Sequence, residues 1–250
     1  MTGAASGIGA ATARLLAAEG ASVYCADVNE AGCRGLAAAI HGDAAAAFAV
    51  TLDVTNEDQW EAGIRRILST SHRLDVLVNS AGISHSSPLS EMTLEEWRRV
   101  FAVNVDGAFL GIKHAIRAMT PNGGSIVNVT SASGIRAAAG ASAYSTSKAA
   151  VGMLTRVAAK ECRERGLPIR VNAVAPGGVR TPMWTTMPFF RELVVQHGSE
   201  AAAFRALAGP DPSRRFAEPY EVAHAIVYLA SDAAAMITGI ELPIDDGYLL

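Results

Sequence analysis

Tyr144 and Lys148 stand four positions apart in the run Tyr144-Ser145-Thr146-Ser147-Lys148, inside a stretch whose pattern predicts a helix. Residues i and i+4 share one face of a helix, so the phenol and the ammonium would face the same cleft. A free tyrosine has a pKa of about 10 and is a poor base at neutral pH, but a nearby cation lowers that pKa by about a unit or more. The pair could therefore take a proton from an alcohol oxygen or return one. The spacing alone is a weak signal, because any surface helix can carry it by chance.

Ser131 ends an expected strand and precedes Tyr144 by 13 residues. A hydroxyl at the carboxyl end of a strand can form a hydrogen bond with the same substrate oxygen that exchanges a proton with Tyr144. The alternative is an ordinary turn serine, and Thr130 and Ser133 are nearby rivals for the role.

A glycine-rich turn opens the chain as Thr2-Gly3-Ala4-Ala5-Ser6-Gly7-Ile8-Gly9, and a helical pattern follows it. Such glycines permit a tight turn and close backbone approach, and the free amides at the helix start can hold a pyrophosphate. The turn therefore predicts a dinucleotide site, although a glycine-rich turn without a ligand is the alternative.

Asp27 ends the next expected strand, 18 residues beyond Gly9, and is followed by Val28 and Asn29. A carboxylate at about this distance binds the adenosine ribose hydroxyls and repels a 2′-phosphate. Since no arginine or lysine stands beside it, the sequence favours NAD over NADP. A solvated carboxylate in a turn is the alternative.

These residues must be positioned by alternating strands and helices, which predict an α/β fold. Expected strands cover 22–27, 47–54, 74–79, 125–131, 169–174 and 242–245, and expected helices 7–19, 30–40, 57–69, 94–119, 142–165, 189–208 and 220–230. Capping boxes are expected at 93–96 and, more weakly, at 55–58. The strands are near-continuous apolar runs, typical of a parallel sheet covered on both faces. We expect one domain over 1–250: a doubly wound, three-layer Rossmann fold, with a substrate lid at about 177–216.

A turn of this kind normally follows a strand, yet only Met1 precedes Thr2. We therefore expect the first strand to be missing or truncated, with two strands left without their neighbour. Either the natural chain starts upstream of Met1 or the chain has been truncated, and we favour these two alternatives over a third, that the sheet is rebuilt.

The composition excludes several classes of protein. The net charge is −3 and the pI about 6.1, so nucleic acid is not an expected partner. The chain lacks a signal peptide pattern, and its apolar runs fall short of the roughly 18 residues that a membrane helix needs. Three separated cysteines and six histidines form no metal-binding spacing, so we expect no metal and a cytoplasmic location. His85 could reach a substrate pocket, although a surface location is the simpler expectation.

Together these motifs resemble the short-chain dehydrogenase/reductase family, in its compact single-domain branch. The likeness runs from Thr2 to Tyr248 and has the motifs in family order: 2–9, Asp53-Val54, 79–82, Asn104, Ser131, Tyr144 with Lys148, Pro176-Gly177, Thr181 and the tail at 237–248. Two positions depart from the family pattern: Ser80 replaces the commoner second asparagine, and Asp246 stands where glycine is usual.

The resemblance implies a catalytic set in which Tyr144 is the acid/base, Lys148 lowers its pKa and Ser131 positions the substrate oxygen. Asn104 would hold a water that links Lys148 to bulk solvent. The turn and the resemblance together give the expected cofactor-binding residues: Gly3, Ser6, Gly7, Ile8, Gly9, Asp27, Asp53, Val54, Asn79, Ala81, Gly82, Tyr144, Lys148, Pro176, Gly177, Val179 and Thr181. Asp53 and Val54 would flank the adenine, Asn79, Ala81 and Gly82 would support the middle of the cofactor, and the last four would close over the nicotinamide.

The expected activity is NAD-dependent hydride transfer between the nicotinamide and a secondary alcohol or ketone. Because the expected lid is rich in aromatic residues and methionines, we expect an apolar substrate that is bulky or cyclic. The resemblance implies a homotetramer, or a homodimer. Two alternatives stay open: an NADP-dependent 3-oxoacyl-carrier-protein-type reductase, and a non-catalytic nucleotide-sensing protein on the same fold.

Overall fold

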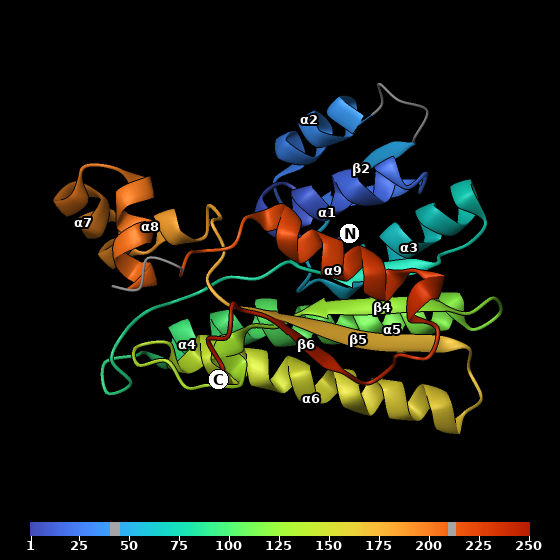
Figure 1. Ribbon diagram of the computed structural model, residues 1–250. Helices are drawn as coiled ribbons and strands as arrows, with labels where there is room; N and C mark the ends of the chain where they lie inside the picture. The colour runs from blue at the N-terminus through green and yellow to red at the C-terminus, as the bar shows by residue number, and fades with distance from the viewer. Residues whose placement is uncertain (41–45, 210–213) are drawn as a thin grey trace.

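A computed structural model describes residues 1–40, 46–209 and 214–250 of the chain (Figure 1). Parallel strands form its centre, in two groups of neighbours. The first group pairs β1 with β2, and the second has the order β3-β4-β5-β6. The strands are β1 (Val23–Asp27), β2 (Ala47–Thr51), β3 (Val76–Asn79), β4 (Gly124–Val129), β5 (Ile169–Pro176) and β6 (Glu241–Ile244).

Met1 and Thr2 lie between the two groups and join them. The Thr2 amide donates to the Val78 carbonyl of β3 at 3.0 Å, and the Met1 carbonyl accepts from the Ala26 amide of β1 at 2.9 Å. A parallel bridge pairs Thr2 with Ala26. The expectation that β1 and β3 would be left apart is thus corrected, because these two residues supply backbone hydrogen bonds to both strands.

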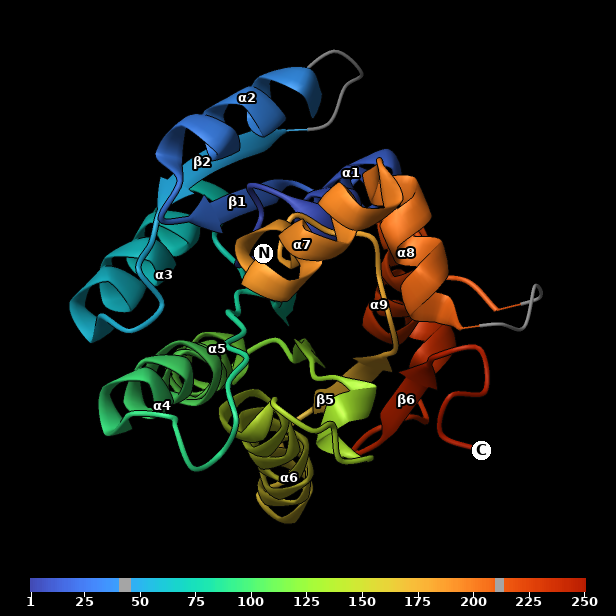
Figure 2. The same ribbon diagram turned by 90° about the vertical axis from the view of Figure 1, so that its left-hand side faces the viewer.

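Helices cover both faces of the sheet, as the apolar strands predicted (Figures 1 and 2). One layer holds α1 (Gly7–Ala18), α2 (Glu30–Ile40) and α9 (Pro219–Ala230); the other holds α3 (Glu57–Ser71), α5 (Gly107–Met119) and α6 (Ser142–Glu164). Ile126 and Val127 are neighbours on β4 and both fully buried, yet they pack into the clusters of opposite layers. The doubly wound α/β fold is therefore confirmed.

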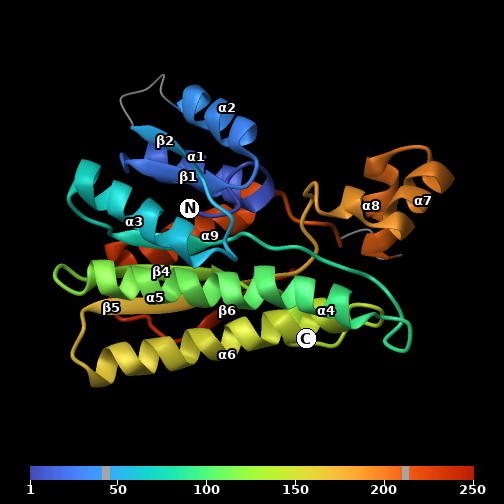
Figure 3. The same ribbon diagram turned by 180° about the vertical axis from the view of Figure 1, so that it is seen from behind.

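The predicted helix over 94–119 is divided by a π-helical turn. It consists of α4 (Leu94–Phe101), the π turn Ala102–Asp106 and α5, which run on without a loop (Figure 3). The predicted capping box at its start is confirmed, since Thr93 and Glu96 bond each other's backbone amides. The weaker box at 55–58 is wrong: Asn56 caps α3, whereas the Thr55 hydroxyl donates to Asp53.

The predicted helix over 189–208 is two helices, α7 (Pro188–His197) and α8 (Glu200–Ala208). Gly198, with φ of 79°, ends α7 in the left-handed conformation, and Ser199 caps α8. This pair stands apart from the sheet layers (Figure 1) and packs around Trp184, whose ring contacts Phe189, Phe190, Phe204 and Phe216. We call the described residues 180–209 and 214–216 the lid.

The remaining short helices are 3-10 turns at Ala132–Gly134, Trp184–Thr186 and Asp232–Ala234. Among the described residues, no helix combines the length and apolarity that crossing a membrane requires.

Candidate active site

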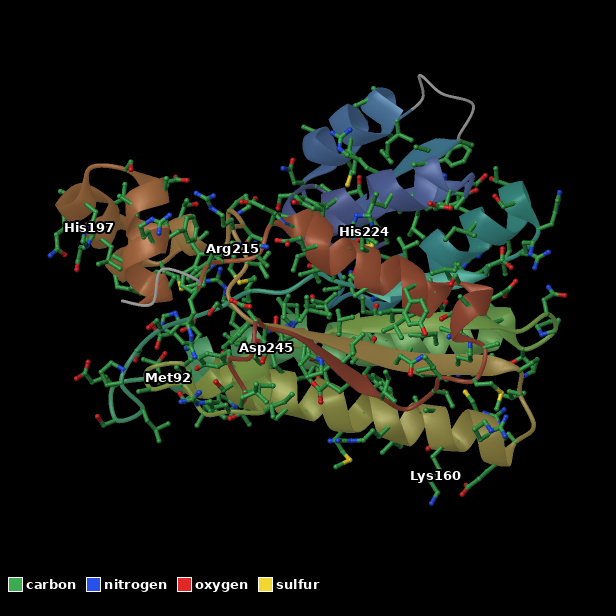
Figure 4. All side chains as sticks on the ribbon, viewed as in Figure 1. Met92, Lys160, His197, Arg215, His224 and Asp245 are labelled. Atoms are coloured by element: carbon green, nitrogen blue, oxygen red, sulfur yellow. The ribbon has the colours of Figure 1, made fainter. Side chains whose placement is uncertain are left out.

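A cleft of about 1080 Å³ lies over the carboxyl ends of the strands. Its walls include Asp27 at the end of β1, Asp53 after β2, Ala81 after β3, Ser131 after β4 and Pro176 at the end of β5. Ligands of open α/β sheets bind at this edge, where the strands end. Arg215 and Asp245 also line the cleft, and Figure 4 places both at the same end of the molecule as Met92.

Most predicted site residues border this one cleft. The predicted residues that line it are Gly3, Ser6, Gly7, Ile8, Gly9, Asp27, Asp53, Val54, Ala81, Gly82, Ser131, Tyr144, Lys148, Pro176, Gly177, Val179 and Thr181. Two predicted residues, Asn79 and Asn104, line a separate small cavity beside Lys148.

The glycine turn is packed so closely that side chains are excluded from it. A Cβ on Gly9 would lie 2.0 Å from the Gly3 carbonyl oxygen, and one on Gly3 would lie 2.8 Å from the Ala81 backbone. Gly3 also has φ of 65°, which favours glycine. The turn therefore brings bare backbone to the cleft at the start of α1, where helix amides and the helix dipole favour an anion.

The carboxylate of Asp27 is held by backbone amides. Its Oδ2 accepts a hydrogen bond from Ala5 at 3.2 Å and its Oδ1 one from Asn29 at 3.0 Å. Among the described residues it has no ion pair with a cation, and the exposed residue next to it is Val28. Asp27 thus offers an unneutralised carboxylate to the cleft, beside the glycine turn.

The Ser131 hydroxyl forms a hydrogen bond with Tyr144. Burial raises the pKa of Tyr144, and a hydrogen bond with Ser131 lowers it part of the way back. The rival hydroxyl of Thr130 is committed to the Val174 carbonyl at 2.8 Å. The fold therefore places Ser131 and Tyr144 together, as the sequence predicted.

Lys148 lies close to Tyr144, but it does not set the direction in which the pKa of Tyr144 shifts. Its Nζ is 5.7 Å from the centre of the Tyr144 ring and donates to the Val129 carbonyl at 2.8 Å. Burial lowers the pKa of Lys148 to about 8. We expected Lys148 to lower the pKa of Tyr144; with the protein's own groups, burial instead leaves that pKa raised.

Asn104 sits in the π turn, where its side chain makes three hydrogen bonds. Its Nδ2 donates to the Ile83 carbonyl at 3.0 Å and to Ser147 Oγ at 2.9 Å, and its Oδ1 accepts from the Ile83 amide at 2.9 Å. Ser147 in turn donates to the Tyr144 carbonyl at 2.7 Å. Asn104 therefore links the segment after Gly82 to the helix that carries Tyr144.

The small cavity beside Lys148 measures about 10 Å³ and is lined by Asn104, Lys148, Asn79 and Thr2 among others. That volume is about the minimum that holds one water molecule. The Asn79 amide donates to Asn128 at 2.9 Å, between β3 and β4, and its expected support of the cofactor stays a prediction. Its buried Oδ1 is without a hydrogen-bond partner in the described part of the chain.

Two parts of the cleft wall were not predicted from the sequence. Glu96 and Arg99 reach it from α4, and Asp245 and Tyr248 reach it from the segment after β6. That segment is tied to the loop after Ser131: Arg136 donates to the Tyr248 carbonyl at 2.7 Å and stacks on its ring at 4.8 Å. A contact across 112 residues leaves no local sequence signal.

A possible metal-binding group occurs outside the cleft. Ligand atoms of Glu57, Glu61 and His114 lie within 4.8 Å of one another. However, Glu57 already pairs with Lys113 at 2.5 Å and with His114 at 3.1 Å, and these contacts lower its pKa. Because Glu57 is already paired with two side chains, this group gives no reason to add a metal, and the absence of a bound metal stays a prediction.

Comparisons with known proteins agree with this architecture. The model of the family described as enoyl-(acyl carrier protein) reductase matches residues 3–249. The chain is 44% identical to a cis-4-hydroxycyclohexanecarboxylate dehydrogenase of Sinomonas cyclohexanicum over 250 residues, 99% of this chain and 94% of the relative. It is 41% identical to a cyclopentanol dehydrogenase of a Comamonas species over 249 residues, 99% and 95% of the two chains.

Solved structures show the same similarity. A levodione reductase superimposes with a TM-score of 0.88 at 34% identity, covering 98% of this chain and 95% of that one. A 3-ketoacyl-(acyl-carrier-protein) reductase from Brucella melitensis, complexed with NADH, superimposes with a TM-score of 0.85 at 32% identity, covering 100% and 96%. With its glycine turn, its Ser131–Tyr144–Lys148 constellation and these relatives, the chain belongs to the short-chain dehydrogenase/reductase family of oxidoreductases.

Proposed function

We propose that this protein is an NAD-dependent dehydrogenase of cyclic secondary alcohols, also acting as a reductase of the matching ketones. The observation that carries the proposal is the meeting of Ser131, Tyr144 and Lys148 in the cleft that Asp27 and the glycine turn also border. When bound, NAD would supply the hydride acceptor and a positive charge near the phenol.

The residues present fit this cofactor. Gly3 and Gly9 leave bare backbone where a Cβ would collide, which suits a pyrophosphate at the start of α1. Asp27 keeps lone pairs for the two ribose hydroxyls and would repel a 2′-phosphate. Asp53 and Val54 would flank the adenine, and Pro176, Gly177, Val179 and Thr181 would enclose the nicotinamide end.

Proton transfer would fall to the protein's own side chains. Lys148 would stabilise Tyr144 as a phenolate, and this phenolate would take the proton of the alcohol oxygen that Ser131 holds, which turns it into a phenol. A water in the small cavity would pass the proton from Lys148 past Asn104 toward solvent. Ser131 and Tyr144 act here as catalytic residues, and Asn104 acts by positioning.

The substrate end favours an apolar ring. The lid turns Met183, Trp184, Met187, Phe189 and Phe216 toward the cleft, so its wall there is largely hydrocarbon and aromatic. The names of three relatives, a cyclopentanol, a hydroxycyclohexanecarboxylate and a dichlorocyclohexadiene-diol dehydrogenase, point to ring alcohols as well.

A 3-oxoacyl-carrier-protein-type reductase using NADP is the second candidate. A relative of that name from Thermotoga maritima is 38% identical over 251 residues. Arg99 and Arg214 also line the cleft without an ion pair among the residues described, and a basic mouth would suit an acidic carrier protein. Asp27 argues against it, because its carboxylate would face the 2′-phosphate of NADP.

A non-catalytic nucleotide sensor is disfavoured by the intact Ser131–Tyr144–Lys148 set.

Self-association through α5 and α6, giving a homodimer or homotetramer, fits three exposed apolar residues there: Phe109, Met153 and Val157, which are 48%, 56% and 44% exposed. A cytoplasmic location remains part of the proposal.

Energy transfer from tryptophan to the bound dihydronicotinamide tests the cofactor first, in titrations with NADH and then NADPH. We expect NADH to bind more tightly by at least about tenfold, the effect of one charged contact. Cyclopentanol and cyclohexanol with NAD, against a 3-oxoacyl thioester with NADPH, then separate the two enzymes. Preference for NADPH together with thioester reduction would refute the proposal, and binding without turnover would indicate a sensor.

A further inference from the structure

The segment after Gly82 is anchored at both ends to elements that carry the acid/base machinery. At one end Asn104 bonds both backbone groups of Ile83. At the other, the Ser87 amide donates to the Gly140 carbonyl at 2.9 Å, four residues before Tyr144. Gly140 has φ of 77°, and a Cβ there would lie 3.4 Å from the Ser86 hydroxyl. The segment from 83 to 87 is therefore fixed beside the start of α6.

His85 stands in the middle of this anchored segment and lines the cleft. Its side chain keeps 35% of its surface exposed, and its Nε2 lies 3.2 Å from Oε1 of Glu96. Glu96 is itself immobilised, because its Oε2 accepts from both the amide and the hydroxyl of Thr93 at 2.8 Å. The glutamate of the capping box at the start of α4 thus lies at ion-pair distance from a histidine in the wall of the cleft.

This arrangement leaves one ring nitrogen for a ligand. Nε2 faces the Glu96 carboxylate at ion-pair distance, and Nδ1 has no hydrogen-bond partner among the described residues. A neutral imidazole that carries its proton on Nε2 offers Nδ1 as an acceptor, and a protonated one offers it as a donor. A hydroxyl group can satisfy either form, a carboxylate only the protonated one, and a methylene neither.

We propose that His85, oriented by Glu96, is a specificity-determining residue that binds a second hydroxyl group on the ring of the substrate, so that the preferred substrates are cyclic diols. The proposal rests on the proposed function and deepens it. The lid supplies the apolar wall for the ring, Ser131 and Tyr144 take the reacting oxygen, and His85 takes the other.

A negatively charged ring substituent is the competing occupant. Glu96 beside His85 disfavours it, since a second carboxylate would meet a like charge. Arg99, one turn further along α4, also lines the cleft and would favour it. The test therefore includes a carboxylated ring and a variant of Arg99.

The test compares kcat/KM with NAD for cyclohexanol, cyclohexane-1,4-diol and 4-hydroxycyclohexanecarboxylate. We expect wild type to prefer the diol, and His85→Ala to lower the diol-to-cyclohexanol ratio about tenfold, the effect of one lost hydrogen bond. His85→Asn places a hydrogen-bonding atom near the position of Nδ1 and should restore part of the ratio. Glu96→Gln keeps the capping box, which accepts glutamine, and should lower the ratio less than His85→Ala.

His224→Ala is the matched control, because His224 lies on α9 outside the cleft lining (Figure 4). NADH binding and the melting temperature of each variant show that it is folded. If wild type oxidises cyclohexanol but His85→Ala leaves the ratio unchanged, the inference fails while the proposed function stands. If the carboxylated ring is preferred and Arg99→Ala removes that preference, the substituent is an anion and the inference is overturned. If wild type oxidises none of the rings, the proposed function fails and the inference with it.

Discussion

The Asp27 carboxylate accepts a hydrogen bond from the Ala5 amide at 3.2 Å, joining the end of β1 to the glycine turn. Asp27 and the glycines of the turn border the cleft, and a second amide, that of Asn29, fixes the other carboxylate oxygen. A carboxylate held in this way cannot swing aside without breaking two backbone hydrogen bonds. Its charge therefore stays where a bound dinucleotide would place the adenosine ribose.

Replacing Asp27 with alanine should narrow the preference for NADH over NADPH. Removing the carboxylate loses two ribose hydrogen bonds and the repulsion of a 2′-phosphate, so NADH should bind about tenfold to a hundredfold more weakly and NADPH more tightly. Fluorescence titration of both cofactors measures the change. Asp58→Ala, on the exposed start of α3, is the control, and an unchanged NADH affinity in Asp27→Ala would exclude this role.

Tyr144→Phe should abolish turnover while sparing the cofactor site. The substitution removes only the phenol oxygen that we propose as the acid/base, and loss of such a group lowers kcat by about 10² to 10⁴. Stopped assays in both directions, with an NADH titration beside them, measure the effect. Residual activity near that of wild type would show that another group moves the proton.

Alcohol oxidation and ketone reduction should depend differently on pH. Burial raises the pKa of Tyr144, so the protein's own groups keep it a phenol and a proton donor at neutral pH. The rate of ketone reduction should then be nearly constant from about pH 6 to 8, because this range lies well below the usual tyrosine pKa of about 10. The rate of alcohol oxidation should rise as the pH increases. Initial rates at saturating cofactor test this, and oxidation that is flat across the alkaline range would contradict it.

Lys148→Met should inactivate the enzyme yet raise its stability at neutral pH. Burial lowers the pKa of Lys148 from its ordinary 10.5 to about 8, so holding the charged form in the fold costs stability. Below pH 8 that cost is present in full. Between 8 and 10.5 the unfolded chain binds more protons than the folded one, so wild type gains stability as the pH rises.

The melting temperature of Lys148→Met should therefore exceed that of wild type most at pH 7, and the gap should shrink above pH 8. Thermal denaturation of both proteins across this range measures the gap. A variant that is less stable than wild type at pH 7 would mean that the lost bond to Val129 outweighs the relieved burial of charge.

Trp184→Ala should loosen the lid and weaken substrate binding more than cofactor binding. The indole contacts four phenylalanine rings and donates to the Val179 carbonyl at 2.8 Å, so its loss should cost the lid about 3 kcal/mol. Faster hydrogen exchange in α7 and α8 and a raised KM for the alcohol are expected. Trp97→Ala, which removes an indole stacked on Phe101 of α4, is the matched control. Equal effects of both variants on KM would show a general loss of stability.

The sequence by itself determined the elements and the chemistry that stands within one element or at its end. Apolar runs predicted the strands, because a strand buried on both faces needs apolar side chains on both. Tyr144 and Lys148 share a face because of helical spacing alone. The glycine turn and Asp27 were readable for the same reason, since each depends on a few adjacent residues.

Only the tertiary structure decided the features that arise between distant segments. Met1 and Thr2 bridge β1 and β3, and Arg136 ties Tyr248 to the cleft. Glu96 lies at ion-pair distance, 3.2 Å, from Nε2 of His85. The raised pKa of Tyr144 belongs to the same group, because the loss of solvent around a side chain is set by everything that packs over it. Spacing along the chain carries no record of such packing, so neither the direction of that shift nor the partner of His85 could be predicted from the residues alone.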